Sequence, residues 1–135
     1  MSPADALEFV SENHRAVLIT RKADGGIQSS PVTVGSDDER VVISSRETAY
    51  KTRNLRRDPR AVLCVFTDKF YGKWMQIEGD TEIVPLPEAM ELLVDYYRRI
   101  RGEHPDWDEY RAVMEKERRV LLRVAIEKVG PTRAG

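Results

Sequence analysis

The sequence predicts a mainly β protein with short helices, in which six antiparallel strands close into a small barrel. Strand-like runs recur along the chain, and helical segments are inserted between them without the regular alternation that builds a parallel sheet. An Asp-Gly-Gly turn signal at residues 24–26 favours a direct hairpin connection between two of the strands. With 135 residues the chain has the size of one ordinary domain, so a single domain over residues 1–135 is expected.

The N-terminal elements are a helix and a hairpin. Ser2 can cap a helix that begins at Pro3, because proline suits the first helical turn. Residues 15–21 and 27–34 are rich in β-forming side chains and are expected to pair across the turn. Pro31 has no N–H donor, which indicates a sheet edge, a bulge or a place where something other than a strand docks.

A third strand and a short helix are expected next. Residues 40–45 follow the polar turn at residues 35–39, so a second hairpin is expected there. Thr48 can cap a helix that runs to Arg57. The helix must end before Pro59, because the residue that precedes a proline avoids the α region.

Two further strands precede a long helical segment. They cover residues 60–67 and 73–84, and Gly79 marks a bulge or bend in the second of them. Apolar residues then recur at helical spacing from Glu88 until Gly102, which closes the helix.

A fourth helix and a sixth strand complete the expected elements. Asp106 and Glu109 have the spacing of a capping box at the start of that helix. The last strand covers residues 119–129, and residues 130–135 are expected to be a frayed end.

The composition excludes several classes of protein. Lys and Arg number 22 against 23 Asp and Glu, and a net charge of −1 does not suit a polycation that coats nucleic acid. The longest apolar stretches, such as residues 61–66, fall far short of the roughly 18 residues of a membrane span. The first residues show no secretory signal, so a cytoplasmic location and no membrane partner are expected.

Familiar chemical motifs are missing from the sequence. It contains no phosphate-binding loop, no paired-cysteine zinc spacing and no His-Glu-x-x-His motif, so no metal site is expected. The single Cys64 has no partner for a disulfide and is expected to be a small buried apolar side chain. Nothing points to a Ser/His/Asp triad, and no catalytic side chain can be assigned.

Residues 46–60 carry the strongest local bias. Six basic and two acidic residues give this segment a local net charge of +4. Ser44 and Ser45 end a strand just before the helix, whose free N–H groups and positive dipole end attract anions such as phosphate. Lys51 and Asn54 are three residues apart on the helix, so an ammonium and an amide group can reach the same anion.

Other interpretations of this segment stay open. Arg53 and Arg57 form a second row of the anion-binding interpretation. Alternatively, Arg56 and Arg57 complement the helix C-terminus and the other cations form a solvated face. Nucleic acid is a third interpretation, but only Tyr50 interleaves with the charges, so no nucleic-acid partner is expected. Trp74 can cover a planar ring or simply fill the barrel.

Three segments of the sequence resemble a known family. They are residues 51–61, 102–111 and 118–122. They resemble the actinobacterial split β-barrel oxidoreductases that use coenzyme F420, in class B of the flavin/deazaflavin oxidoreductases within the pyridoxamine 5'-phosphate oxidase-like superfamily. The resemblance covers nearly the whole chain, and it implies a six-stranded antiparallel split β-barrel of the FMN-binding type.

The resemblance also implies a homodimer with the cofactor in a groove at the subunit interface. Lys51 and Asn54 would hold the phosphate-bearing tail, the backbone around Pro31 and Val32 would lie against the deazaflavin ring, and Trp74 would help to wall the groove. The residues expected to bind the cofactor are Pro31, Val32, Ser44, Ser45, Arg46, Tyr50, Lys51, Asn54 and Trp74.

The function implied by the resemblance is an F420-dependent reductase. It would pass a hydride from the reduced deazaflavin to an unsaturated organic acceptor, a small planar molecule that the sequence does not name. The cofactor would carry the chemistry, while the protein aligns the two reactants and excludes water. The alternatives are an FMN-binding oxidase or reductase of the same superfamily and a non-catalytic deazaflavin or flavin carrier.

Overall fold

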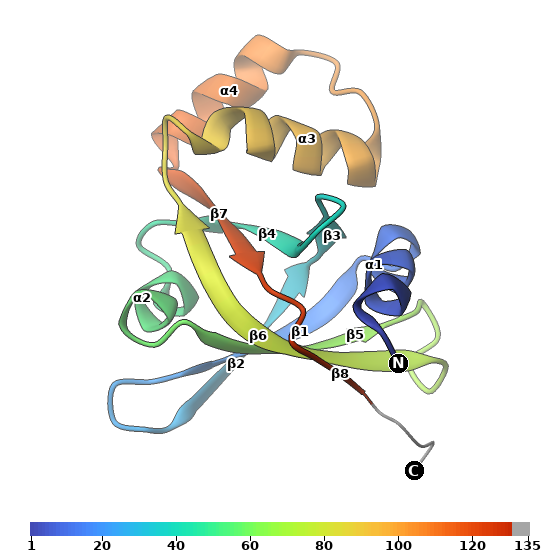
Figure 1. Cartoon of the computed structure of the whole chain (residues 1–135). Coiled ribbons are helices and arrows are strands. Elements are labelled where there is room, and N and C mark those ends of the chain that lie inside the picture. The colour runs from blue at the N-terminus through green and yellow to red at the C-terminus, as the bar shows by residue number, and fades with distance from the viewer. Residues whose placement is uncertain (131–135) are drawn as a thin grey trace.

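Eight strands form one curled antiparallel sheet in this computed structural model, which describes residues 1–130 (Figure 1). The strands are β1 (Arg15–Arg21), β2 (Ile27–Thr33), β3 (Gly35–Ser36), β4 (Val41–Arg46), β5 (Arg60–Phe66), β6 (Trp74–Val84), β7 (Arg119–Val124) and β8 (Lys128–Gly130). The helices are α1 (Pro3–Glu12), α2 (Tyr50–Arg57), α3 (Ala89–Arg101) and α4 (Trp107–Lys116). The fold class predicted from the sequence, mainly β with short helices, is confirmed.

The order of the strands places β2 at one edge of the sheet. Neighbouring strands follow the sequence β2-β1-β5-β6-β7-β4-β3, and β8 pairs with β6 off this path. The predicted hairpin of β1 and β2 is confirmed, with Pro31 opposite Val17. The prediction that residues 27–34 and 40–45 form a second hairpin is wrong. Strand β4 pairs instead with β7 and with the short β3, which lies in the expected turn. Pro31 therefore lies in an edge strand, one of the positions that its missing donor allows.

The last expected strand is divided in two. After β7 the backbone leaves the ladder, and β8 then pairs with the other half of the sheet. The connecting residues are still tied to β6, because Ala125 N–H donates to the Asp80 carbonyl at 2.9 Å and Glu127 N–H to the Glu78 carbonyl at 3.0 Å. Six long strands and two short ones thus replace the six expected. The expected frayed end lies outside the described residues except for Gly130, which ends β8.

Strand β6 belongs to both halves of the sheet. Residues 74–80 pair with β5, whereas residues 81–84 pair with β7. At the crossing, a Cβ atom on Gly79 would lie only 1.7 Å from the carbonyl oxygen of Ala125. Glycine is therefore required at position 79, because another backbone segment passes against it. The bulge that the sequence indicates there as one alternative is absent, since the ladder with β5 keeps an unbroken register through Gly79.

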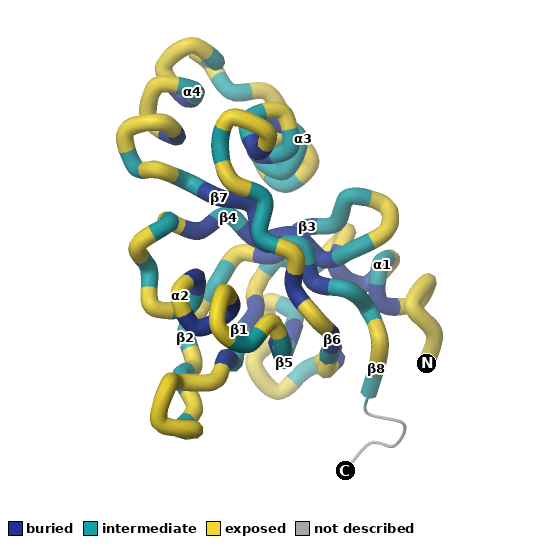
Figure 2. The backbone as a smooth tube through the Cα atoms, turned by 60° about the vertical axis from the view of Figure 1, so that its left-hand side comes forward, coloured by how far each residue is buried: buried dark blue, intermediate teal, exposed yellow. Residues whose placement is uncertain are grey.

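Two apolar cores lie on the two sides of this crossing. One fills the curled sheet beneath α1 and α2, and the other lies between the α3–α4 pair and strands β4 and β7. Figure 2 shows the buried residues along β7, β4 and β3, whereas the tip of the β1–β2 hairpin is exposed. None of the four helices described is long and apolar enough to cross a membrane.

The start of α2 differs from the expectation. Ala49 is the N-cap and makes no side-chain bond there, so the prediction that Thr48 caps the helix is wrong. The reason is a turn in which Ala49 N–H donates to the Arg46 carbonyl and delays the helix by one residue. Thr52 fixes this end instead, because its hydroxyl donates to the Arg46 carbonyl at 2.7 Å and lies 2.8 Å from the Ser45 hydroxyl.

Candidate functional site

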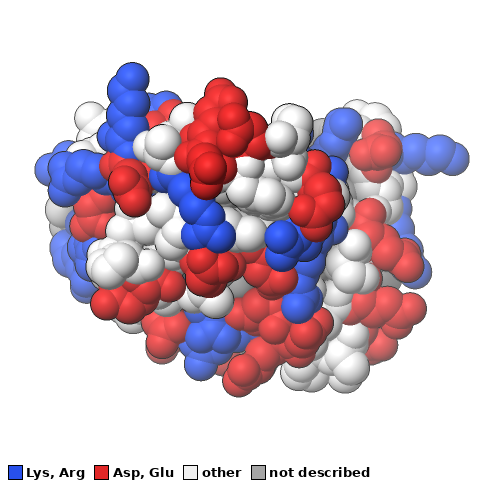
Figure 3. Space-filling model, turned by 90° about the horizontal axis from the view of Figure 1, so that it is seen from above, with Lys and Arg blue, Asp and Glu red and all other residues white. Residues whose placement is uncertain are grey.

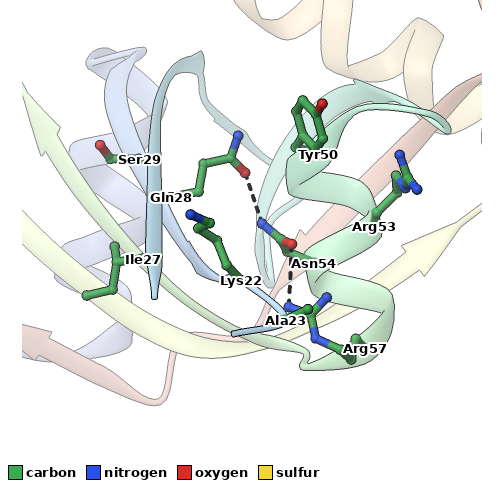
Figure 4. A pocket seen from close by; sticks show the side chains of 9 residues that line it. All are labelled: Lys22, Ala23, Ile27, Gln28, Ser29, Tyr50, Arg53, Asn54 and Arg57. Atoms are coloured by element: carbon green, nitrogen blue, oxygen red, sulfur yellow. Dashed lines mark hydrogen bonds between the residues drawn. The ribbon is translucent and has the colours of Figure 1, made fainter. Parts of the chain in front are cut away.

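A groove of about 610 Å³ lies between the β1–β2 hairpin and α2 (Figure 4). Its walls come from the hairpin on one side and from one face of the helix on the other. The residues that line it are Lys22, Ala23, Ile27, Gln28, Ser29, Tyr50, Arg53, Asn54 and Arg57.

The helical wall follows directly from the spacing of residues in α2. Tyr50, Arg53, Asn54 and Arg57 are separated by three, one and three residues, which places them on one face of a helix. Tyr50 stands at the entrance with 71% of its surface exposed. The groove therefore has an aromatic ring at one end of the helix and guanidinium groups along the rest of it.

A hydrogen-bond network joins the two walls. Asn54 is 8% exposed, and its Nδ2 donates to Thr20 Oγ1 at 3.1 Å and to Gln28 Oε1 at 2.9 Å. Its Oδ1 accepts from the Arg57 guanidinium at 3.4 Å, and Arg57 also donates to the carbonyl of Arg21. Helix and hairpin are thus held in one arrangement before any ligand binds.

The groove is positively charged. Lys22, Arg53 and Arg57 contribute cations, and none of the described residues that line the groove carries a carboxylate. The nearest acidic partner of Lys22 is Asp24 at the hairpin tip, 3.9 Å from its ammonium group. Within residues 1–130, neither Arg53 nor Arg57 has a carboxylate within 4 Å. Such a lining suits an anionic ligand.

Several basic residues outside the groove are already neutralised by acidic partners. Arg56, on the far side of α2, lies 2.6 Å from Glu47, and Arg60 binds three carboxylates. The α3–α4 side of the molecule likewise intersperses both signs of charge (Figure 3), with ion pairs such as Arg111–Glu91. Arg53 and Arg57 at the groove differ in this respect from Arg56 and Arg60.

The structure separates Lys51 from Asn54. Lys51 does not line the groove and lies half-buried near Arg46 and Arg119. Burial, followed by the two guanidinium groups, lowers the pKa of its ammonium group below the ordinary value. No carboxylate within residues 1–130 pairs with it. A second group of cations, made of Arg46, Lys51 and Arg119, thus lies beside the N-terminus of α2, and Arg119 in it is paired with Glu117 at 2.8 Å.

The two predicted serines differ in their surroundings. Ser45 is 1% exposed, and its hydroxyl is bonded to Thr52, so it anchors α2 to β4. Ser44 is half-buried in β4, where its neighbour across the ladder is Leu121. Arg46, the last residue of β4, is exposed.

Pro31, Val32 and Trp74 lie away from the groove in a single protomer. The register aligns Thr33, Arg15, Phe66 and Trp74 in one row across four strands, at the end of the sheet opposite the hairpin tip. Trp74 is 42% exposed, so the interpretation that it fills the barrel is wrong. Val32 packs against the core, whereas Pro31 is exposed.

The outer face of this part of the sheet carries an apolar patch among polar and charged side chains. Directly paired residues share a face, and the outward side chains are half-buried or exposed. The apolar ones are Ile27 and Pro31 of β2, Val17 and Ile19 of β1, Val62, Cys64 and Phe66 of β5, and Trp74 of β6, and they share the face with polar residues such as Arg15, Ser29, Gln76 and Glu78. Cys64 is thus partly exposed on this outer face, and the expectation of a fully buried side chain is wrong. Burial still raises the pKa of its thiol.

Sequence reasoning found the helical wall and missed the hairpin wall. The spacing in α2 already grouped Arg53 with Arg57, but Lys22, Ile27, Gln28 and Ser29 were not expected at the site. The available signal was the short turn at residues 24–26, which forces Lys22 and Ile27 to the same end of the hairpin. The sequence does not show that α2 docks against that end of the hairpin.

Comparisons with known proteins agree with the fold. A model of the pyridoxamine 5'-phosphate oxidase family matches residues 2–133. An F420H(2)-dependent biliverdin reductase of Mycobacterium tuberculosis is 27% identical over 126 residues, covering 93% of this chain and 84% of the reductase.

Solved structures share the architecture. A conserved hypothetical protein from Mycobacterium tuberculosis matches with a TM-score of 0.77 and 24% identity, covering 100% of this chain and 92% of its own. A protein described as an F420 reductase matches with a TM-score of 0.72 and 19% identity, covering 91% of this chain and 94% of its own. The family match over residues 2–133, together with the split-barrel fold that the sequence predicts, shows that the chain belongs to the pyridoxamine 5'-phosphate oxidase family.

Proposed function

We propose that this protein is a reductase that binds coenzyme F420 and delivers a hydride from its reduced form to an unsaturated organic acceptor. The observation that carries the proposal is the groove lined by Lys22, Arg53 and Arg57 without a carboxylate. The biliverdin reductase at 27% identity uses F420H(2), which supports the same cofactor here. Biliverdin is an unsaturated organic molecule, and we propose an acceptor of this class, unsaturated and planar, for this protein.

The residues fit a cofactor that combines an anionic tail with a planar ring. The guanidinium groups of Arg53 and Arg57 offer forked donors to phosphate or carboxylate oxygens. Tyr50 and Ile27 add apolar surface at the same groove. When bound in its reduced form, the deazaflavin supplies the hydride.

The roles of the chain are to bind, to orient and to exclude water. In this proposal Lys51, with Arg46 beside it, holds a further anionic group of the cofactor or acceptor. Ser44 lies on the same side of α2, and Ser45 keeps the helix N-terminus in position through Thr52. No side-chain nucleophile is needed for the transfer.

A second copy of the chain completes the site in this proposal. The apolar outer face of β1, β2, β5 and β6 needs a cover in water, and Ile27 and Ser29 belong both to this face and to the groove. A partner that docks there would bring its own Trp74, its own Pro31 and its own backbone at Val32 to the groove. These residues, which one protomer keeps apart from the groove, would then contact the ring of the cofactor.

The test is a pair of calorimetric titrations of the purified protein, one with F420 and one with FMN. Tight F420 binding and weak FMN binding, followed by oxidation of reduced F420 in the presence of an acceptor, is the expected result. The reverse preference would make the protein a flavin enzyme. F420 binding without turnover over a broad panel of quinones, enones and tetrapyrroles would make it a carrier.

Matched variants locate the binding site. Arg53→Ala and Lys51→Ala should each weaken F420 binding by about tenfold, because each removes a charge-assisted contact. Arg56→Ala is the control on the same helix, because Arg56 is already paired with Glu47. If all three variants bind F420 as tightly as the wild type does, the basic face of α2 is a solvated surface and not a binding site.

A further inference from the structure

We propose that Gln28 is a ligand-binding residue of the groove and that Asn54 is a positioning residue that acts through it. This inference rests on the proposed function, because it assumes that the groove between α2 and the β1–β2 hairpin holds the cofactor. Gln28 belongs to none of the segments that carry the family resemblance. The inference also gives Asn54 a different task from the direct contact predicted by its spacing from Lys51.

The argument starts at Arg57, because a guanidinium group carries donors only. Its contact with Asn54 is at 3.4 Å, and the Asn54 atom that faces it must be the acceptor Oδ1. The Nδ2 group of Asn54 then has to point to the other side. There it meets Thr20 Oγ1 at 3.1 Å and Gln28 at 2.9 Å.

The orientation of Gln28 follows from that of Asn54. An N–H group cannot bond to another N–H group, so Gln28 must present Oε1 to Asn54 Nδ2. The Nε2 group of Gln28 is left on the groove side, as Figure 4 shows. Both of its N–H donors lack a partner among residues 1–130.

Burial makes this arrangement rigid. Asn54 is 8% exposed and Thr20 is 1% exposed, so a rotation of the Asn54 amide would leave polar groups unpaired inside the protein. The side chain of Gln28 therefore cannot turn its oxygen toward the ligand without breaking the network. In this arrangement Gln28 presents N–H donors to the groove.

The chemistry of the groove defines what Gln28 contacts. Its neighbours Lys22, Arg53 and Arg57 are also donors only, so the bound group must be rich in acceptor oxygens. Gln28 differs from these cations because it is neutral and fixed. Its N–H group donates to one acceptor oxygen of the cofactor and fixes the position of that oxygen, whereas the cations supply most of the attraction.

The experiment measures F420 affinity by calorimetry in Gln28→Met, Asn54→Ala and the double variant. Gln28→Met keeps the length of the side chain and removes both donors, and we expect about tenfold weaker binding. Asn54→Ala should weaken binding to a similar degree on its own and should add nothing in the Gln28→Met background. Ala112→Met is the control, because it places a methionine at an exposed position of α4, outside the residues that line the groove, without removing a donor.

A second measurement covers the case in which Asn54→Ala does not fold. The side-chain amide resonance of Gln28 in an NMR spectrum is identified by its loss in Gln28→Met, and we expect it to shift when F420 is added to the wild-type protein. Unchanged affinity in Gln28→Met, or an unmoved resonance at saturation, overturns the inference. A further loss of F420 affinity in the double variant, relative to Gln28→Met alone, overturns the role of Asn54.

These outcomes are separate from those of the proposed function. If the wild-type protein binds FMN in place of F420, the same variants are titrated with FMN and decide the role of Gln28. If it binds neither, both proposals fail. If it binds F420 and Gln28→Met binds equally well, the proposed function stands and only this inference falls.

Discussion

Lys51 is the residue whose environment departs most from that of an ordinary surface lysine. Burial and the guanidinium groups of Arg119 and Arg46 lower its pKa below the ordinary value of 10.5. Its charge is therefore lost at a lower pH than the charge of an exposed lysine, and an anionic ligand that it holds should be released in the same range.

The prediction is that F420 affinity falls as pH rises through this lowered pKa, and that Lys51→Gln removes this part of the fall. Calorimetric titrations between about pH 7 and pH 10 measure both proteins, in buffers of equal ionic strength. Because arginines keep their charge in this range, the difference between the two profiles reports Lys51. Parallel profiles would show that Lys51 does not contact the ligand.

The candidate site could be predicted from the sequence where it depends on one helix. Spacing grouped Arg53 with Arg57, which both line the groove, but it also grouped Asn54 with Lys51, which the structure places outside the groove. Gln28 could not be found in this way, because its role depends on the register of β2 and on the docking of α2 against that strand. The roles of Ser45 and Asn54 as anchors likewise depend on burial, which spacing does not report.

At the scale of elements, Gly79 decides whether β6 can pass from one half of the sheet to the other. A Cβ atom there would lie 1.7 Å from the Ala125 carbonyl oxygen, a contact that only backbone movement can relieve. We expect Gly79→Ala to cost about 3 kcal/mol or more in the free energy of unfolding, at or above the upper end of usual overpacking costs. Urea unfolding measures it.

Gly130→Ala is the control for this prediction, since a Cβ atom at Gly130 would meet no atom within 4 Å. It should leave the midpoint of unfolding unchanged. A Gly79→Ala variant as stable as the wild type would mean that the segment after β7 moves freely away from β6.

The α3–α4 pair contains a tyrosine that predicts alkaline sensitivity. Burial, followed by the neighbouring Tyr96, raises the pKa of Tyr110 to about 12, and its hydroxyl donates to the Leu93 carbonyl at 2.8 Å. The folded state holds the phenol neutral, so this contribution to stability is complete below about pH 10 and is lost as pH rises toward 12.

We expect Tyr110→Phe to be less stable than the wild type by about 1 kcal/mol at neutral pH. The difference in stability should shrink between about pH 10 and pH 12. In this range the Tyr110 phenol ionises in the unfolded wild type but not in the folded one, whereas the Tyr110→Phe variant has no group to ionise at this position. Urea unfolding at several pH values measures both proteins. A difference that stays constant up to pH 12 would contradict the raised pKa.

The order of elements was largely predictable, whereas two short strands were not. The hairpin of β1 and β2 and the break before Pro59 follow from local turn chemistry. Strand β3 has only two residues, and β8 exists because Gly79 lets the chain cross to the other half of the sheet. Such pairings are long-range and leave no periodic pattern in the sequence.

At the scale of the whole molecule, the apolar outer face predicts association. We expect the protein to be a dimer by light scattering, and Val17→Lys to convert it to a monomer by placing a charge between Pro31 and Cys64, its uncharged neighbours on that face. Val113→Lys on α4 is the control, because Val113 is 36% exposed on another side of the molecule. A wild-type monomer, or a dimer unaffected by Val17→Lys, would exclude this face as the interface.

The dimer also predicts a spectroscopic difference. If the partner's Trp74 contacts the cofactor, F420 should quench part of the tryptophan fluorescence in the wild type but not in Trp74→Phe, where only Trp107 remains. Trp107 lies against Tyr97 and Tyr110 in the α3–α4 pair and serves as the internal reference. Equal quenching in both proteins would place Trp74 away from the cofactor.

The passage of β6 through both halves of the sheet has a consequence for unfolding. Residues 74–80 and 81–84 are consecutive in one strand, so neither apolar core can open without pulling on the hydrogen bonds of the other. Heat should therefore melt the α3–α4 side and the groove side in a single cooperative transition. A small protein built in this way exposes no half-folded form to proteases, and its groove persists as long as the distant helices remain in place.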